Sequence, residues 1–328
     1  MSPPPRRPRG GSAAAAAHAV HNPVRIRIVS RAADARRLVR GGSCALECSF
    51  GSESVVCPLE LDHHGSRHEL PGVAIRAYGE LFGARRDRPW FVVTGAPDED
   101  LTWALGSLAG LLPHPSRGAE FASAPEPMRG IWTRDWTPLV ELINRVDTDP
   151  AGVDLARSDE GRMILLWRLR SSLPLRDVSA FHAGLDRWRA LLVHATEEDL
   201  ARAPWVLRRR LATIRGLPHE SFGRVTLIDS SIWGYSATYA REWHEIHRSP
   251  LLFVFQPRSS GRGVVTVSAV DRAAAESLYG AGGLLNLLPR LAPRGWGGRP
   301  LIGGSARGRP ITWDQARAAA RLAARLAG

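Results

Sequence analysis

The pattern of hydrophobic and polar residues predicts a chain that alternates between strands and helices. Period-two alternation and short apolar runs indicate strands, whereas apolar residues three and four apart indicate helices. Strands that alternate with helices favour an α/β fold with a parallel sheet. In chain order, the first half gives the strands 24–29, 44–50 and 90–93 and the helices 32–39, 73–82 and 101–112.

The second half predicts a smaller α/β domain. Two long amphipathic helices, 177–195 and 197–215, end at the segment 216–220, where glycine and proline interrupt the pattern. Beyond this break we expect the strands 224–228, 251–255 and 264–270 and the helices 239–246, 273–279 and 312–327. The predicted organisation is a disordered tail over 1–23, a parallel-sheet α/β domain over 24–216 and a second α/β domain over 221–328.

The triplet Asp62-His63-His64 has no place in either periodic pattern. It follows the apolar run 55–61 and precedes a glycine. A carboxylate supplies hard oxygen and neutral imidazole suits first-row transition metals, so the triplet predicts a site for a divalent cation. The alternative is an ordinary polar turn.

Two further acidic pairs follow apolar segments. Asp98 and Asp100 lie between the strand 90–93 and the helix that begins near residue 101, where carboxylates can point into the crevice beyond a strand end. They could instead cap that helix. Asp147 and Asp149 form the third pair, for which the alternative is a solvated turn before a proline. The predicted metal ligands are Asp62, His63, His64, Asp98, Asp100, Asp147 and Asp149.

A glycine-rich segment, 295–305, is the second candidate for chemistry. Clustered glycines let backbone amides approach an anion closely, and arginine binds phosphate or carboxylate with a forked geometry. An ordinary flexible turn is the alternative. The predicted substrate-binding residues are Gly297, Gly298, Arg299, Gly303, Gly304, Ser305 and Arg307.

Composition excludes several chemistries. The 328 residues suffice for two domains, and +8 of the net charge of +12 lies in residues 1–40. The chain has no lysine, which excludes a lysine Schiff base, a lysine-linked pyridoxal phosphate and a P-loop lysine. Cys44, Cys48 and Cys57 lack metal-site spacing and predict buried thiols in a reducing cytoplasm. No apolar run approaches the roughly 20 residues that span a bilayer, so no membrane association is expected.

Taken together, these motifs resemble those of the DHH/DHHA1 phosphoesterase superfamily. Its members join an α/β domain that carries an Asp-His-His triplet and an Asp-x-Asp motif to a smaller α/β domain with a Gly-Gly-His-type loop. Asp62-His63-His64 matches the triplet, Asp98-Glu99-Asp100 the second motif and Gly297-Gly298-Arg299 the loop. This chain differs in that the triplet comes first, no histidine precedes Asp98, and Arg299 replaces the loop histidine.

The resemblance implies a cytoplasmic, metal-dependent hydrolase with a cleft between two domains. Its cofactor would be a divalent metal, Mn²⁺ by analogy, with Asp62 and His64 as the catalytic residues. A phosphorylated small molecule or short nucleotide is the expected anionic substrate, and a homodimer is left open. Two alternatives remain: a metabolic enzyme on the same scaffold that acts on a non-phosphate substrate, and an arginine-rich nucleic-acid-binding protein with an inactive site.

Overall fold

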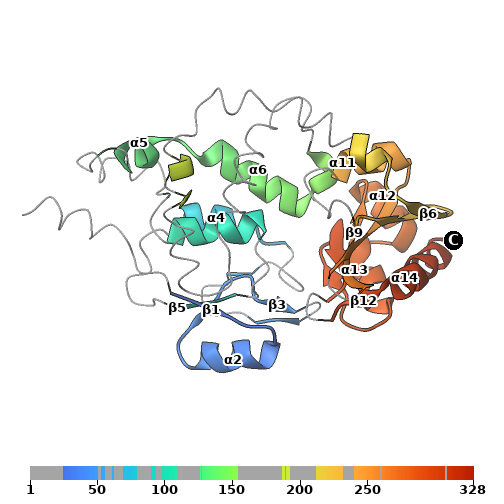
Figure 1. The fold of residues 1–328 in the computed structure, drawn as a ribbon, viewed down its shortest axis with the longest axis horizontal. Coiled ribbons are helices and arrows are strands. Elements are labelled where there is room, and N and C mark those ends of the chain that lie inside the picture. The colour runs from blue at the N-terminus through green and yellow to red at the C-terminus, as the bar shows by residue number, and fades with distance from the viewer. Residues whose placement is uncertain are drawn as a thin grey trace, which may run out of the picture.

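The computed structural model has the mixed α/β architecture that the sequence predicts. We call residues 25–153 the N-terminal lobe and residues 219–328 the C-terminal lobe; in Figure 1 they are blue to green and yellow to red. The structure describes residues 25–50, 53–55, 61–62, 69–79, 90–93, 98–108, 112, 126, 128–153, 187–188, 190–192, 212–231, 240–258, 261–306 and 309–328.

The N-terminal lobe is built on a parallel sheet, as predicted. Its strands β1 (Arg25–Ile28), β5 (Trp90–Val93) and β2 (Cys44–Ala45) lie in the order β1-β5-β2. The helix α2 (Ala32–Arg40) covers one face, and α4 (Glu99–Leu108) lies on the other (Figure 1). The antiparallel pair β3 (Ser49–Phe50) and β4 (Glu53–Ser54) follows β2.

Buried helices fill the space above this sheet. Every residue of α4 from Asp100 to Leu108 is buried, so this helix is surrounded by protein. Trp103 lies at its centre and packs against Trp136 and Trp188, with ring centroids 5.9 and 5.8 Å apart. The helix α4 also contacts α3 (Val73–Gly79) and α6 (Thr137–Thr148). The helix α5 (Met128–Thr133) precedes α6, and the 3-10 helix η3 (Pro150–Gly152) follows it.

In the C-terminal lobe, the described residues form a seven-stranded mixed sheet. The order is β10-β11-β9-β8-β7-β6, and β12 also pairs with β9. Among the strand pairs of the described residues in this lobe, only β7 and β8 run parallel, so this sheet is largely antiparallel. The strands are β6 (His219–Phe222), β7 (Val225–Asp229), β8 (Leu251–Pro257), β9 (Arg262–Ala269), β10 (Gly297–Gly298), β11 (Ile302–Gly304) and β12 (Ile311–Thr312).

Alternation along β8 divides the lobe's interior between two cores. Leu251, Phe253 and Phe255 belong to the cluster that contacts α12 (Arg272–Tyr279), α13 (Leu284–Leu287) and α14 (Trp313–Leu326). Leu252 and Val254 point to the opposite face and join the cluster that holds α4 and α6. The two lobes therefore share one hydrophobic core across this face.

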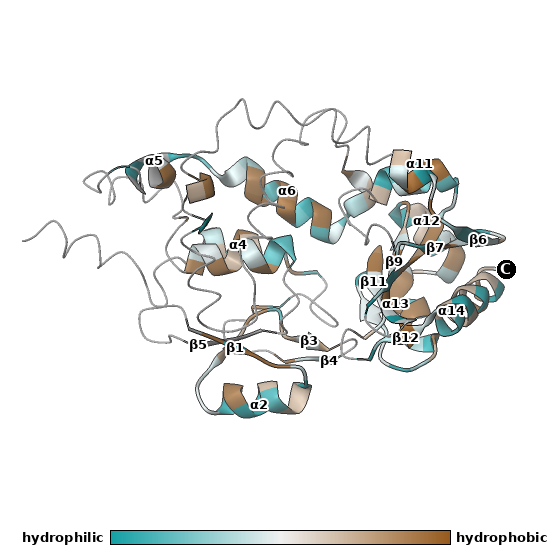
Figure 2. Ribbon diagram, viewed as in Figure 1, coloured by the Kyte–Doolittle hydropathy of each residue, from teal (hydrophilic) through white to brown (hydrophobic). Residues whose placement is uncertain are grey.

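The helix α14 illustrates how closely a local pattern can predict structure. The hydroxyl of Thr312 accepts a hydrogen bond from the amide of Gln315, and the Gln315 side chain accepts one from the amide of Thr312. Alanines of α14 face the sheet and its arginines face outward, which Figure 2 shows as brown and teal sides. The helix predicted over 312–327 is confirmed.

Several elements were not predicted, β6 and α13 among them, and part of the prediction lies outside the described residues. The strand β6 begins within the segment read as a pattern break, and α13 lies in a stretch assigned to no element. Most of the helices predicted over 177–195 and 197–215 fall outside the described residues. The domain boundary near 216–220 stays a prediction. None of the described helices is long and apolar enough to cross a membrane.

Candidate functional site

Asp62 is completely buried beside the end of β2. Its backbone carbonyl accepts a hydrogen bond from Nη2 of Arg76 on α3 at 3.1 Å. The amide of Glu47 donates to the carbonyl of the preceding residue, Leu61, at 2.7 Å. These contacts fix the backbone at Asp62 between the strand and α3, and so determine where its carboxylate lies.

Asp98 and Asp100 each cap a helix, but not the same one. The Oδ1 atom of Asp98 accepts from the amide of Leu101 at 3.0 Å, which caps α4. Asp100 is 1% exposed, and its two oxygens accept from the amides of Val73 at 2.7 Å and Ala74 at 2.8 Å. The alternative that these residues cap the following helix therefore holds for Asp98, whereas Asp100 caps α3 instead.

The start of α3 requires a glycine. A Cβ atom at Gly72 would lie 2.8 Å from Oδ1 of Asp100, inside van der Waals contact. The Gly72 amide donates to Oδ1 of Asn144 on α6 at 2.7 Å. The first turn of α3 is thus held by side chains from α4 and α6, which brings these helices together next to Asp62.

Glu47 is the residue that the sequence reasoning missed. It lies two residues after β2 with φ of 47°, in the left-handed region that few non-glycine residues adopt, and is 4% exposed. Burial raises its pKa well above the ordinary value, and the charges of Asp98, Asp100, Asp147 and Asp62 raise it further. These five residues therefore gather in one region, and we call them the carboxylate cluster.

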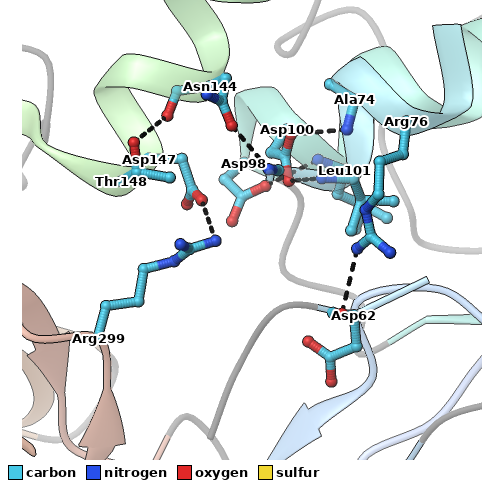
Figure 3. A network of polar contacts seen from close by, with 12 residues as sticks. Asp62, Ala74, Arg76, Asp98, Asp100, Leu101, Asn144, Asp147, Thr148 and Arg299 are labelled. Atoms are coloured by element: carbon cyan, nitrogen blue, oxygen red, sulfur yellow. Dashed lines mark hydrogen bonds and ion pairs between the residues drawn. The ribbon is translucent and has the colours of Figure 1, made fainter. Parts of the chain in front are cut away.

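The cluster draws its members from distant parts of the chain. Figure 3 shows the carboxylates of Asp62, Asp98 and Asp147 around a common space, with the guanidinium of Arg299 at its edge. Cys48, which follows Glu47 in the chain, also lies near Asp62: burial and then the charge of Asp62 raise the pKa of its thiol to about 12. Cys44 and Cys48 are both buried, as predicted, and Cys57 lies outside the described residues.

The two aspartates of the third acidic pair, Asp147 and Asp149, make different contacts. Oδ2 of Asp147 lies 3.3 Å from Nη2 of Arg299, an ion pair that joins α6 to the C-terminal lobe. The Arg299 side chain is only 6% exposed, so this contact is shielded from solvent. Asp149 is exposed and accepts from the amide of Gly152, as in the alternative of a solvated turn.

The glycine-rich segment forms paired strands rather than an open loop. Gly297 and Gly298 pair with Gly304 and Gly303, and β11 pairs in turn with β9. A Cβ at Gly304 would collide with the carbonyl oxygen of Val265, so close strand packing accounts for this glycine. Ser305 lies beyond β11, and its hydroxyl accepts from the amide of Val265 at 2.9 Å.

Three predicted site residues, His63, His64 and Arg307, lie outside the described residues. Within the part of the chain that the structure describes, no group of three histidine, cysteine, aspartate or glutamate residues is arranged to hold a metal ion. Asp62, Asp98 and Asp147 are brought together with Arg299, as a shared site requires. Their roles as metal and substrate ligands, and those of the remaining residues, stay predictions.

No family model and no curated protein matches this sequence. Among solved structures, it is similar to PggH from Vibrio cholerae, a pGpG-specific phosphodiesterase. The identity is 15% and the TM-score 0.35, over 59% of this chain and 67% of that one. This similarity is too weak to assign a family. The resemblance to the DHH/DHHA1 superfamily stays a prediction, and the neighbour's activity is of the phosphoesterase class.

Proposed function

We propose that this protein is a phosphoesterase-type hydrolase whose active site is the carboxylate cluster. The observation that carries the proposal is the burial of Glu47 among four aspartates that belong to other segments. Like charges held together in a low-dielectric region lower the stability of the fold, and such arrangements concentrate at functional sites. A bound cation would offset that repulsion.

The described residues alone do not form a three-ligand group for a metal ion, so the proposed cation site depends on His63 and His64 as well. In charge and in ligand chemistry the combined donor set suits a divalent cation. Asp62, Asp98 and Glu47 offer carboxylate oxygens, which Mn²⁺ and Mg²⁺ prefer, and His63 and His64 would add imidazole nitrogens. Asp100 fits less well, because both of its oxygens already accept backbone hydrogen bonds. When bound, the ion's contribution would be to polarise a phosphoryl oxygen and to activate water.

The chain's own residues would bind and orient the substrate. Arg299 is the natural partner for a phosphate oxygen, because its guanidinium is buried beside the cluster and offers several donors. Arg76 holds the backbone of Asp62 in place. The proposed division of labour is that the N-terminal lobe carries the chemistry and the C-terminal lobe binds the anion.

Hydrolysis of bis(p-nitrophenyl) phosphate by Mn²⁺-loaded protein tests this function. Asp62→Asn and Asp98→Asn should each lower kcat by about 100-fold or more, because each removes a charge from the reacting centre. Asp34→Asn is the matched control, since Asp34 is on α2 and pairs with Arg37 at the surface. Full activity in Asp62→Asn would contradict the proposal. If no phosphate ester is hydrolysed, the alternative of a non-phosphate substrate gains support.

A further inference from the structure

A pocket of about 270 Å³ lies where the two lobes meet. Glu69, Asn144 and Thr148 line it from the N-terminal lobe, and Arg272 and Arg299 line it from the C-terminal lobe. Its volume is below the roughly 300–1,000 Å³ of pockets that enclose drug-sized ligands. The pocket therefore suits a small metabolite, or one unit of a larger molecule.

The C-terminal wall of the pocket is cationic. Arg272 is the first residue of α12, and its side chain is 64% exposed, with Nη1 3.7 Å from the carboxylate of Glu276. So long and exposed a pair stabilises the fold little, so Arg272 can turn toward a ligand at small cost. Arg299 supplies the second guanidinium, which is buried and oriented by Asp147. Two guanidinium groups on one wall favour a phosphate or carboxylate group.

The opposite wall presents neutral and acidic hydrogen-bonding groups beside Leu70 and Pro71. Oδ1 of Asn144 accepts from the Gly72 amide, which turns the Nδ2 donors of Asn144 away from that bond. The hydroxyl of Thr148 donates to the carbonyl of Asn144 at 2.8 Å, so its oxygen is left as an acceptor. Glu69 adds a carboxylate. Donors and acceptors together on one wall suit hydroxyl groups, which both donate and accept.

The Asp147–Arg299 ion pair connects this pocket to the carboxylate cluster. Asp147 belongs to the cluster, where its charge raises the pKa of Glu47, and its partner Arg299 lines the pocket. An anion bound by Arg299 would compete with Asp147 for the guanidinium. A ligand in the pocket is therefore next to the cluster, and its binding would loosen one contact between the lobes.

We propose that this pocket binds a phosphorylated polyol, with its phosphate against Arg272 and Arg299 and its hydroxyl groups against Glu69, Asn144 and Thr148. If the proposed function is correct, the bound molecule is the part of the substrate that is not cleaved. Arg272 is then a substrate-binding residue that belongs to none of the sequence motifs.

Calorimetric titration of the full chain, with EDTA present, tests the pocket without requiring turnover. The probes are ribose 5-phosphate, inorganic phosphate and ribose. We expect ribose 5-phosphate to bind at least about tenfold more tightly than either of the others, because only it contacts both walls. Arg272→Ala should weaken that binding by at least about tenfold, and Glu69→Gln should weaken it while leaving the affinity for phosphate unchanged.

Arg290→Ala is the matched control, because Arg290 is exposed on the same lobe, outside the pocket. Equal affinity of wild type and Arg272→Ala for ribose 5-phosphate would overturn the proposal, as would no binding at all. Tight binding of inorganic phosphate alone would overturn the proposal that the ligand is a polyol. Specific binding in a protein without hydrolase activity would keep the pocket and refute the proposed function.

Discussion

Burial shifts the pKa of two titratable side chains, one in each lobe, toward the neutral form, but the two side chains have different surroundings. His244 in α11 (Ala240–His247) is 2% exposed, and burial lowers its pKa to about 4. Its Nδ1 lies 2.6 Å from the carbonyl of Ser249 and its Nε2 lies 3.1 Å from the hydroxyl of Ser268. Both ring nitrogens of a neutral imidazole are thereby satisfied. Glu47 is buried to a similar degree, but its neighbours are four carboxylates.

The difference separates a structural interior from a functional one. A buried polar group with complete hydrogen bonding helps to specify a fold, and His244 meets that description. A buried acid beside like charges lowers stability, and proteins retain such groups where a ligand or reaction needs them. We therefore infer that the C-terminal sheet provides a stable frame, whereas the region around Glu47 is shaped by its function.

The largest expected effect on stability comes from Asp100, the member of the carboxylate cluster whose side chain supports the start of α3. Asp100→Ala would leave the buried amides of Val73 and Ala74 without acceptors. Each unsatisfied donor costs about 1–3 kcal/mol, so we expect the free energy of unfolding to fall by about 4 kcal/mol in urea denaturation. Asp98→Ala removes one hydrogen bond of a half-buried cap and should cost about 1 kcal/mol. Equal losses in the two variants would show that Asp100 is not the main support of α3.

His244 should make the protein sensitive to acid. The unfolded imidazole takes up a proton near pH 6.5, whereas the folded one resists until about pH 4. The unfolded state therefore binds more protons between these values, so the stability that is present above pH 6.5 is lost as pH falls. The loss from this group should reach about 3 kcal/mol at pH 4.

A comparison with His244→Gln isolates this effect from other titrations. The variant should be less stable than wild type at pH 7, because glutamine cannot reproduce both hydrogen bonds. The difference should shrink as the pH falls toward 4, as measured by urea denaturation across that range. A difference that is constant with pH would mean that His244 titrates normally in the folded protein.

The smallest expected change is a gain in stability from Glu47→Gln. Glutamine keeps the shape of the side chain and removes a buried acid, so the melting temperature should rise by an amount equivalent to about 1 kcal/mol. Glu53→Gln is the matched control, because Glu53 forms an exposed pair with Arg36 in the same lobe. A lower melting temperature in Glu47→Gln than in this control would show that the Glu47 carboxyl group does not lower the stability of the fold. It would thereby contradict the contrast drawn with His244.

The elements that sequence predicted are those fixed by local pattern. Short apolar runs identified β7 and β8, and the cap at Thr312 identified the start of α14, because neighbouring residues alone decide these features. Gly216 and Pro218 hid β6, whose register depends on pairing with β7. The glycines of β10 and β11 predicted a loop, because the close contacts that require glycine at these positions come from the neighbouring strand.

The same distinction between local and long-range information applies to the site residues. Asp62, Asp98 and Asp147 follow apolar segments in recognisable acidic motifs, and the structure gathers them in one region. Glu47 is a single acidic residue in an apolar stretch, and no local sequence pattern marks it as a site residue. Arg272 looks like an ordinary first-turn residue of a helix, and only the pocket between the lobes distinguishes it.

Calorimetric titration with Mn²⁺ tests most directly whether the carboxylate cluster is a cation-dependent active site. Wild-type protein should bind about one to two ions per chain, as expected for metal-assisted hydrolysis. Asp62→Asn and Asp98→Asn should each lower the affinity or the stoichiometry, whereas Asp34→Asn should match wild type. An unchanged titration in both cluster variants, or no binding by the wild type, would contradict the account.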